Sequence, residues 1–239
     1  MRFIGMDERL EKEWEQLQTE MSNKISLKSS FKKEDIKYVA GVDLAYYTLN
    51  QKEFAVCNIL IFNYETLELE DQAEYHGEVK VPYVAGFLAF RELPFILEAV
   101  KKLIACPDIY MFDGNGYLHY RHMGLATHAS FYLNKPTIGV AKNYLKISDT
   151  DFIMPTETAN SHTDIVVNGE LYGRCLRTRA KVKPIFISCG NWIDIETTTE
   201  VVLHFITSES RLPIPVRYAD IETHKSRTGL LEDDSDRAL

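Results

Sequence analysis

Three acidic residues lie in parts of the sequence that are otherwise apolar. Asp43 interrupts a strongly apolar run, Glu92 lies within the apolar segment 87–104, and Asp113 directly follows four apolar residues. An isolated ionised carboxylate in an apolar interior is costly, whereas converging carboxylates can bind a hard divalent cation, which prefers oxygen ligands. Each acid alone would more simply cap a strand or a helix. All three together predict a metal-dependent site that cleaves phosphodiesters.

The elements expected around these acids would bring them together. Asp43 falls in a predicted strand over 37–46, and Asp113 ends a predicted strand over 108–113. Glu92 lies at the edge of the buried face of a helix that spans its apolar segment. We therefore expect the two aspartates on neighbouring strands, with Glu92 reaching them from the helix.

The rest of the chain also shows strand and helix patterns. Further helices are expected at 7–22, with Asp7 as a plausible cap, and at 122–134 and 194–208; further strands are expected at 53–63, 66–78, 137–141, 164–168, 170–180 and 184–189, with loops at 23–35 and 148–163. A hairpin-like link at 49–52 suggests that the first strands pair antiparallel, and later strands alternate with helices. This order implies a single α/β domain, a mixed β-sheet flanked by α-helices.

Composition restricts the class of protein. With 239 residues, 45% hydrophobic and 26% charged, the chain is typical of a soluble globular protein. No run approaches the length of a membrane span, and the N-terminus carries no apolar signal-peptide stretch. The cysteines, at 57, 106, 175 and 189, form no CxxC pair, so we expect no zinc site, no disulfide and a cytoplasmic location.

The net charge of −8 would argue against a nucleic-acid substrate if it were spread over the whole chain. The charge is uneven, however. Between Lys101 and Lys183, eleven Lys or Arg stand against seven Asp or Glu, while the last ten residues are acidic. The acidity therefore lies mainly outside the middle segment.

A row of basic residues ends this middle segment. Arg177, Arg179, Lys181 and Lys183 recur at every second position. If one strand holds them, period-two spacing places them on one face, which would suit binding to phosphates. A solvated sheet face is the alternative interpretation.

Five short motifs follow one another along the chain. They are YVAGVD at 38–43, PYVAGFLAFRE at 82–92, DGNG at 113–116, GVAK at 139–142 and RTR at 177–179. In this order they resemble the endonuclease V family, over about residues 7–225. The resemblance implies an RNase H-like fold and an Mg²⁺-dependent hydrolase in which Mn²⁺ substitutes. It also implies incision at the second phosphodiester 3′ to deaminated bases, chiefly hypoxanthine (inosine), in DNA repair.

The resemblance assigns roles to individual residues. Asp43, Glu92 and Asp113 become the catalytic, metal-binding acids, Asp220 a further metal ligand, and Lys142 a contact to a phosphate or to the attacking water. Two metals a few ångströms apart can activate water and stabilise the leaving oxygen. Without the resemblance, Asp220 would be a solvated tail acid and Lys142 a strand-end surface lysine.

Base recognition is assigned in the same way. Tyr83 resembles the wedge that fills the gap left by an extruded base. The implied base pocket is lined by Gly86, Leu88, Gly114, Gly116, His119, Gly124 and Leu125. The phosphate-binding residues would be Arg177, Arg179 and Lys181. Ala85 is a departure, because bacterial members usually carry a proline there, and the stretch 82–96 is more similar to the eukaryotic version.

The sequence therefore predicts a catalytic domain over 1–225 and an acidic, flexible tail over 226–239 that frays after Glu222. The expected substrate is DNA with deaminated bases, cut by a monomer. One alternative is an endoribonuclease acting mainly on inosine-containing RNA. A non-catalytic nucleic-acid-binding module is disfavoured by the intact acids, and an ATP-binding relative by the lack of a P-loop.

Overall fold

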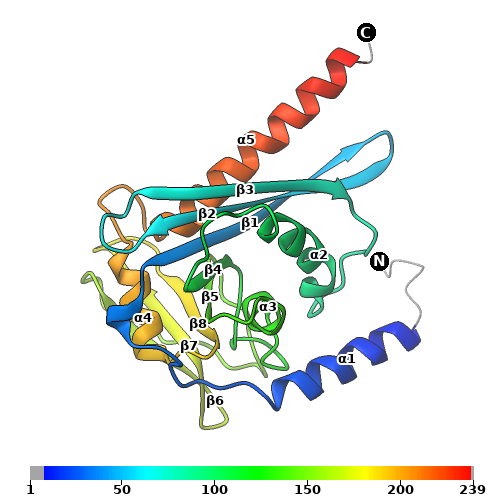
Figure 1. The fold of residues 1–239 in the computed structure, drawn as a ribbon. Helices are drawn as coiled ribbons and strands as arrows, with labels where there is room; N and C mark the ends of the chain where they lie inside the picture. Colours follow the sequence, from blue (N-terminus) through cyan, green and yellow to red (C-terminus); the bar gives the residue numbers. More distant parts are fainter. Residues whose placement is uncertain (1–7, 238–239) are drawn as a thin grey trace.

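An eight-stranded mixed sheet forms the centre of the protein in this computed structural model, which describes residues 8–237, with side chains to 232 (Figure 1). The expected cap Asp7 lies outside the described residues. The strands are β1 (Tyr38–Leu49), β2 (Lys52–Asn63), β3 (Leu69–Glu78), β4 (Ile109–Asp113), β5 (Thr137–Ala141), β6 (Ser161–Val167), β7 (Glu170–Arg177) and β8 (Ile185–Asn191). Their order across the sheet is β3-β2-β1-β4-β5-β8-β7-β6.

The first three strands form an antiparallel meander, as the sequence predicts. Leu49 pairs with Lys52, and the two turn residues Asn50 and Gln51 both have positive φ, at 49° and 63°. This is the backbone of a tight two-residue hairpin, whose twist matches that of the strands. β1 is antiparallel to β2 but parallel to β4, and β4 is parallel to β5, so the pairing changes from antiparallel to parallel at β1.

Helices cover both faces of the sheet. The helices are α1 (Glu8–Ser22), α2 (Leu88–Val100), α3 (Leu125–Leu133), α4 (Ile195–His204) and α5 (Ile214–Arg237), with a 3₁₀ turn at Lys33–Asp35. α2 and α3 bury one face with Phe112, whereas α4 and α5 bury the other with Met111. Adjacent strand residues point to opposite faces, so each central strand contributes to both cores.

The expected mixed sheet flanked by helices is confirmed, but several boundaries differ from the sequence prediction; β1, for example, continues to Leu49 and α4 ends at His204. α2 ends at Val100, not at 104, and Pro94 lies inside it. β6 begins at Ser161, within the expected polar loop. β7 ends at Arg177, because the following residues turn and Lys181 adopts a left-handed φ of 59°.

The C-terminal helix is the largest difference. The sequence predicts fraying after Glu222, yet α5 continues to Arg237 and extends beyond the sheet (Figure 1). Its first half packs on β1, β2 and β4, where Val216 and Ala219 are buried. The charged residues that suggested a tail are compatible with a solvent-exposed helix; the expected flexibility stays a prediction.

The N-terminal helix α1 packs near the start of α2. Trp14 stacks on Phe90 with ring centroids 4.4 Å apart, and Gln18 is completely buried. Among residues 8–237, no helix combines the length and apolar character that spanning a bilayer requires.

Candidate active site

Asp43 and Asp113 lie side by side on two central strands of the sheet. β1 and β4 run parallel, and the paired residues Val42 and Phe112 immediately precede the two aspartates. Asp113 is the last residue of β4, whereas β1 continues past Asp43 to Leu49, so the two carboxylates meet where the parallel pairing ends. Both side chains are half-buried.

Glu92 approaches the aspartates from α2. Its side chain is buried, and the Tyr46 hydroxyl donates a hydrogen bond of 2.8 Å to its Oε1. Burial raises the pKa of Glu92 to about 8. The nearby charge of Asp43 contributes to this rise, whereas the Tyr46 hydrogen bond opposes it. Burial likewise raises the pKa of Asp43 to about 7, with Asp113 and Asp220 contributing.

Lys142 connects two of the carboxylates. It directly follows β5, and its Nζ lies 2.6 Å from Asp113 Oδ2 and 3.0 Å from Asp220 Oδ1. Partial burial disfavours its charge, but the two carboxylates outweigh this and raise the pKa of Lys142. Burial also raises the pKa of Asp113, although Lys142 partly opposes the shift. Lys142 is therefore a charged ammonium held between the carboxylates of Asp113 and Asp220.

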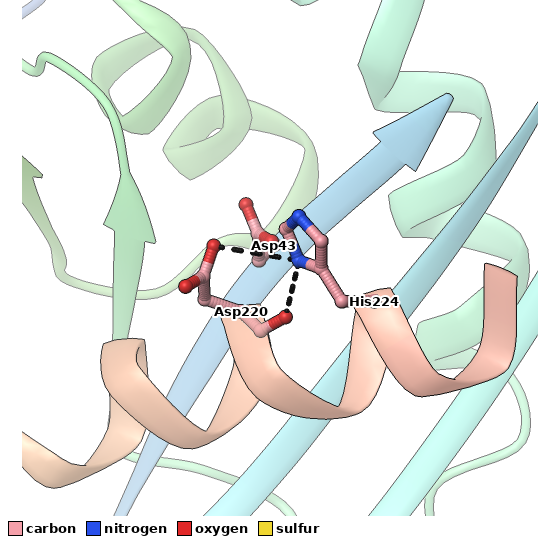
Figure 2. Close-up of side chains that lie close together, drawn as sticks. All are labelled: Asp43, Asp220 and His224. Atoms are coloured by element: carbon pink, nitrogen blue, oxygen red, sulfur yellow. Dashed lines mark hydrogen bonds and ion pairs between the residues drawn. The ribbon is translucent and has the colours of Figure 1, made fainter. Parts of the chain in front are cut away.

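His224 joins the site from α5, one helical turn after Asp220 (Figure 2). Ligand atoms of Asp43, Asp220 and His224 all lie within 4.8 Å of one another. The His224 Nδ1 is 2.8 Å from the Asp220 carbonyl oxygen and 3.7 Å from its carboxylate. The sequence analysis missed His224, because that part of the chain was expected to fray. The spacing of four residues from Asp220 was the available signal.

The donor set fits a hard divalent cation. Burial makes the ionised forms of Asp43, Glu92 and Asp113 unfavourable, as their raised pKa values show. Carboxylate oxygens are preferred ligands of Mg²⁺ and Mn²⁺, and one imidazole is compatible with Mn²⁺. A cation at this place would compensate the charges that burial leaves poorly solvated.

The expected base-pocket residues gather mainly around the loop after β4. Gly124 N donates to Gly116 O at 3.0 Å, and a Cβ on Gly114 would lie 3.9 Å from Leu125. Gly116 serves close packing, because a Cβ there would be 2.3 Å from the carbonyl oxygen of Cys189. The backbone N–H groups of Gly114 and Gly116 donate to Val140 O and Ser188 Oγ, which holds the loop against the neighbouring strands.

The remaining residues of the predicted pocket lie on two segments, the one that follows the loop after β4 and the one that leads into α2. His119 is buried, which lowers its pKa to about 3, so its ring is neutral. Gly86 lies beside Tyr120 and Arg121, and Leu88 begins α2. Tyr83 is 66% exposed on the segment between β3 and α2.

The predicted basic row is wrong in its geometry. Arg177 is buried and donates hydrogen bonds to the carbonyl oxygens of Pro155, Thr156 and Val182. It fastens a loop and is not available to a phosphate. Arg179 and Lys181 follow the end of β7 on a turn, so they share no strand face with Arg177. Their contact with phosphates stays a prediction.

Asp43 and Asp113 on neighbouring parallel strands, with buried Glu92 beside them and Lys142 bound to Asp113 and Asp220, define a carboxylate site on an α/β fold. The family model Endonuclease V matches residues 19–221. The chain belongs to the endonuclease V family, which confirms the resemblance seen in the motifs.

Individual relatives agree over nearly the whole chain. Endonuclease V of Bacillus thuringiensis subsp. konkukian is 60% identical over 226 residues, which cover 95% of this chain and 96% of the relative. The crystal structure of the Bacillus subtilis protein matches with a TM-score of 0.91 and 49% identity, covering 98% and 97%. Endonuclease V of Ciona intestinalis, solved with a 24mer DNA containing an inosine followed by a ribo-adenosine, matches with a TM-score of 0.81 and 26% identity, covering 94% and 100%.

Proposed function

We propose that the protein is an Mg²⁺-dependent endonuclease, with Mn²⁺ as a substitute, that cuts DNA at the second phosphodiester 3′ to a deaminated base, chiefly hypoxanthine. The observation that carries this proposal is the convergence of acids at one place: Asp43 and Asp220 lie close together, Lys142 binds Asp113 and Asp220, and Glu92 is buried near Asp43 and Asp113. The inosine in the DNA bound by the Ciona intestinalis relative supports the choice of base.

The metal-holding residues would be Asp43, Glu92, Asp113 and Asp220, with His224 at the rim. When bound, divalent cations lower the pKa of water and stabilise charge on phosphate oxygens. Tyr46 fixes one oxygen of Glu92 by its hydrogen bond. This bond orients the carboxylate and leaves its other oxygen for a ligand.

Lys142 has the contacts expected of a residue that binds the scissile strand. Its ammonium is held between Asp113 and Asp220, and is only about one-third exposed. A phosphate entering the site could accept a hydrogen bond from the same nitrogen. A fixed cation at this position stabilises negative charge that develops during phosphodiester hydrolysis.

Base selectivity would come from backbone groups of the loop at 114–116 and from neutral His119. Hypoxanthine has a keto oxygen at C6 and nothing at C2. Adenine would leave a backbone donor unpaired, at a cost of about 1–3 kcal/mol, and guanine would add an amino group at C2 that closely packed backbone excludes.

The test uses matched oligonucleotides with inosine, adenosine or guanosine at one position, as DNA and as RNA. We expect inosine to be cut at least about tenfold faster, since 1.4 kcal/mol corresponds to tenfold. Cleavage should stop in EDTA and return with Mg²⁺ or Mn²⁺. Equal cutting of all three bases would contradict the proposal, and faster cutting of RNA would favour the endoribonuclease alternative.

Two variants distinguish an effect on the active site from a general effect of removing an acidic side chain. Asp43→Ala should abolish cleavage but leave substrate binding, because it removes a metal ligand and not the pocket. Asp149→Asn, at an exposed position whose left-handed φ of 58° an asparagine tolerates, should cut normally. Full activity of Asp43→Ala would show that Asp43 is not part of the active site.

A further inference from the structure

The segment that carries Tyr83 is fastened at both of its ends. Residues 81–87, here called the wedge loop, connect β3 to α2. At one end, Arg91 Nη1 donates to the Val81 carbonyl oxygen at 2.6 Å. At the other end, the Gly86 carbonyl oxygen accepts from Gln18 Nε2 at 3.2 Å and from Arg121 Nη2 at 3.0 Å.

The second attachment is a closed set of hydrogen bonds. Besides their shared acceptor, Arg121 Nε donates to Gln18 Oε1 at 2.7 Å. Gln18 is completely buried, and the Arg121 guanidinium lies 4.4 Å from the ring centre of Phe87. Gln18, Arg121 and the Gly86 carbonyl thus form one unit, here called the clamp.

The clamp joins three separate parts of the chain. Gln18 comes from α1, Gly86 from the wedge loop, and Arg121 from the segment that also holds His119, whose Nδ1 accepts from the Arg121 backbone N–H at 3.4 Å. α1 is in turn fixed to α2 by the stacking of Trp14 on Phe90. The clamp therefore sets the position of the wedge loop relative to the proposed base pocket.

We propose that Gln18 and Arg121 are positioning residues for the Tyr83 wedge, an inference that rests on the proposed function. Tyr83 itself is 66% exposed. A side chain that inserts into a duplex must keep its place while bases are forced apart. Ala85 does not restrict φ as a proline would, so the tethers at Val81 and Gly86 restrict the wedge loop from outside.

The test compares inosine-containing duplex with the same strand unpaired. Gln18→Ala and Arg121→Lys should each lower kcat/KM on the duplex by about tenfold or more, since small misplacements carry large rate costs. The loss on the single strand should be markedly smaller, because no partner base has to be separated. Gln16→Ala is the matched control: Gln16 lies on the same helix but bonds only to exposed Glu20 among the described contacts.

A double variant decides whether the clamp acts through the wedge. If it does, adding Gln18→Ala to Tyr83→Ala should cost much less on the duplex than Gln18→Ala costs alone. Equal costs in both backgrounds, or equal losses on duplex and single strand, would overturn the inference and indicate a general packing role. Arg121→Lys keeps the charge and removes the forked contact, so it provides the same comparison if Gln18→Ala folds poorly.

Failure of this inference is distinguishable from failure of the proposed function. A wild-type protein that does not prefer inosine would refute the function itself. A wild-type protein that prefers inosine, with clamp variants that lose nothing on the duplex, would refute only the positioning role of Gln18 and Arg121.

Discussion

Without metal, the protein should lose stability as the pH rises, and replacing Asp43 should remove part of that loss. Burial raises the Asp43 pKa from 3.8 to about 7. Between these pH values the folded protein retains a proton that the unfolded chain has released. Raising the pH removes this proton from the folded state, so the Asp43 contribution to stability falls across the window. Glu92, with its pKa raised to about 8, acts in the same direction.

The size of the effect follows from the pKa shift. A change of about 3 pKa units corresponds to roughly 4 kcal/mol. Asp43 retains partial contact with solvent, which screens its charge. We therefore expect Asp43→Asn to stabilise the metal-free protein by about 2 kcal/mol at pH 8.5 and by little at pH 4.

Urea unfolding in EDTA, followed by fluorescence of Trp14 and Trp192, measures this difference. Asp149→Asn, at an exposed position, is the control. Added Mg²⁺ or Mn²⁺ should stabilise the wild type at pH 8.5, by about 2.7 kcal/mol at 100 times the dissociation constant, and should stabilise the Asn variant less. A stability difference between wild type and Asp43→Asn that does not change with pH would refute the reasoning.

Further predictions concern single residues. Tyr83→Ala should weaken binding to inosine-containing duplex by about 1–3 kcal/mol and binding to single strands less, measured by fluorescence anisotropy; equal losses would indicate a structural tyrosine. Arg177→Ala should destabilise the fold by about 1.5–3 kcal/mol, because buried hydrogen bonds to a charged group are lost. The salt dependence of DNA binding should stay unchanged; a shallower dependence in the variant would indicate that Arg177 does contact a phosphate. His224→Ala should weaken Mn²⁺ binding by roughly tenfold and Mg²⁺ binding less, because imidazole suits Mn²⁺ better; calorimetry with each ion distinguishes the two. Gly116→Val should unfold or misassemble the loop, because its Cβ would meet the Cys189 carbonyl at 2.3 Å; a native circular dichroism spectrum and melting temperature would contradict this.

Local patterns were sufficient for most elements of the sheet. The hairpin at 49–52 and the strand Thr137–Ala141 lie where turn residues and apolar runs predict them. These signals work because a tight turn and a buried strand each impose requirements on a few adjacent residues. The end of β7 carried no such signal, since alternating basic residues are equally compatible with a strand and with a turn.

The basic residues show why side-chain roles need the fold. Arg177 and Lys142 are both cations next to strand ends. Only the surroundings distinguish them: carbonyl oxygens at 155, 156 and 182 occupy Arg177, whereas Asp113 and Asp220 hold Lys142. These partners lie up to 78 positions away in sequence, and period-two spacing contains no information about them.

By itself, the sequence determined the mixed α/β sheet, the three central acids and the family, because apolar runs interrupted by acids and motifs in fixed order are properties of the chain alone. Tertiary structure decided which side chains join those acids. His224 reaches the site because α5 continues past Glu222 and packs across β1. Gln18 reaches Gly86 because α1 is stacked against α2. Both contacts depend on how elements distant in sequence pack together, and packing is a property of the complete fold.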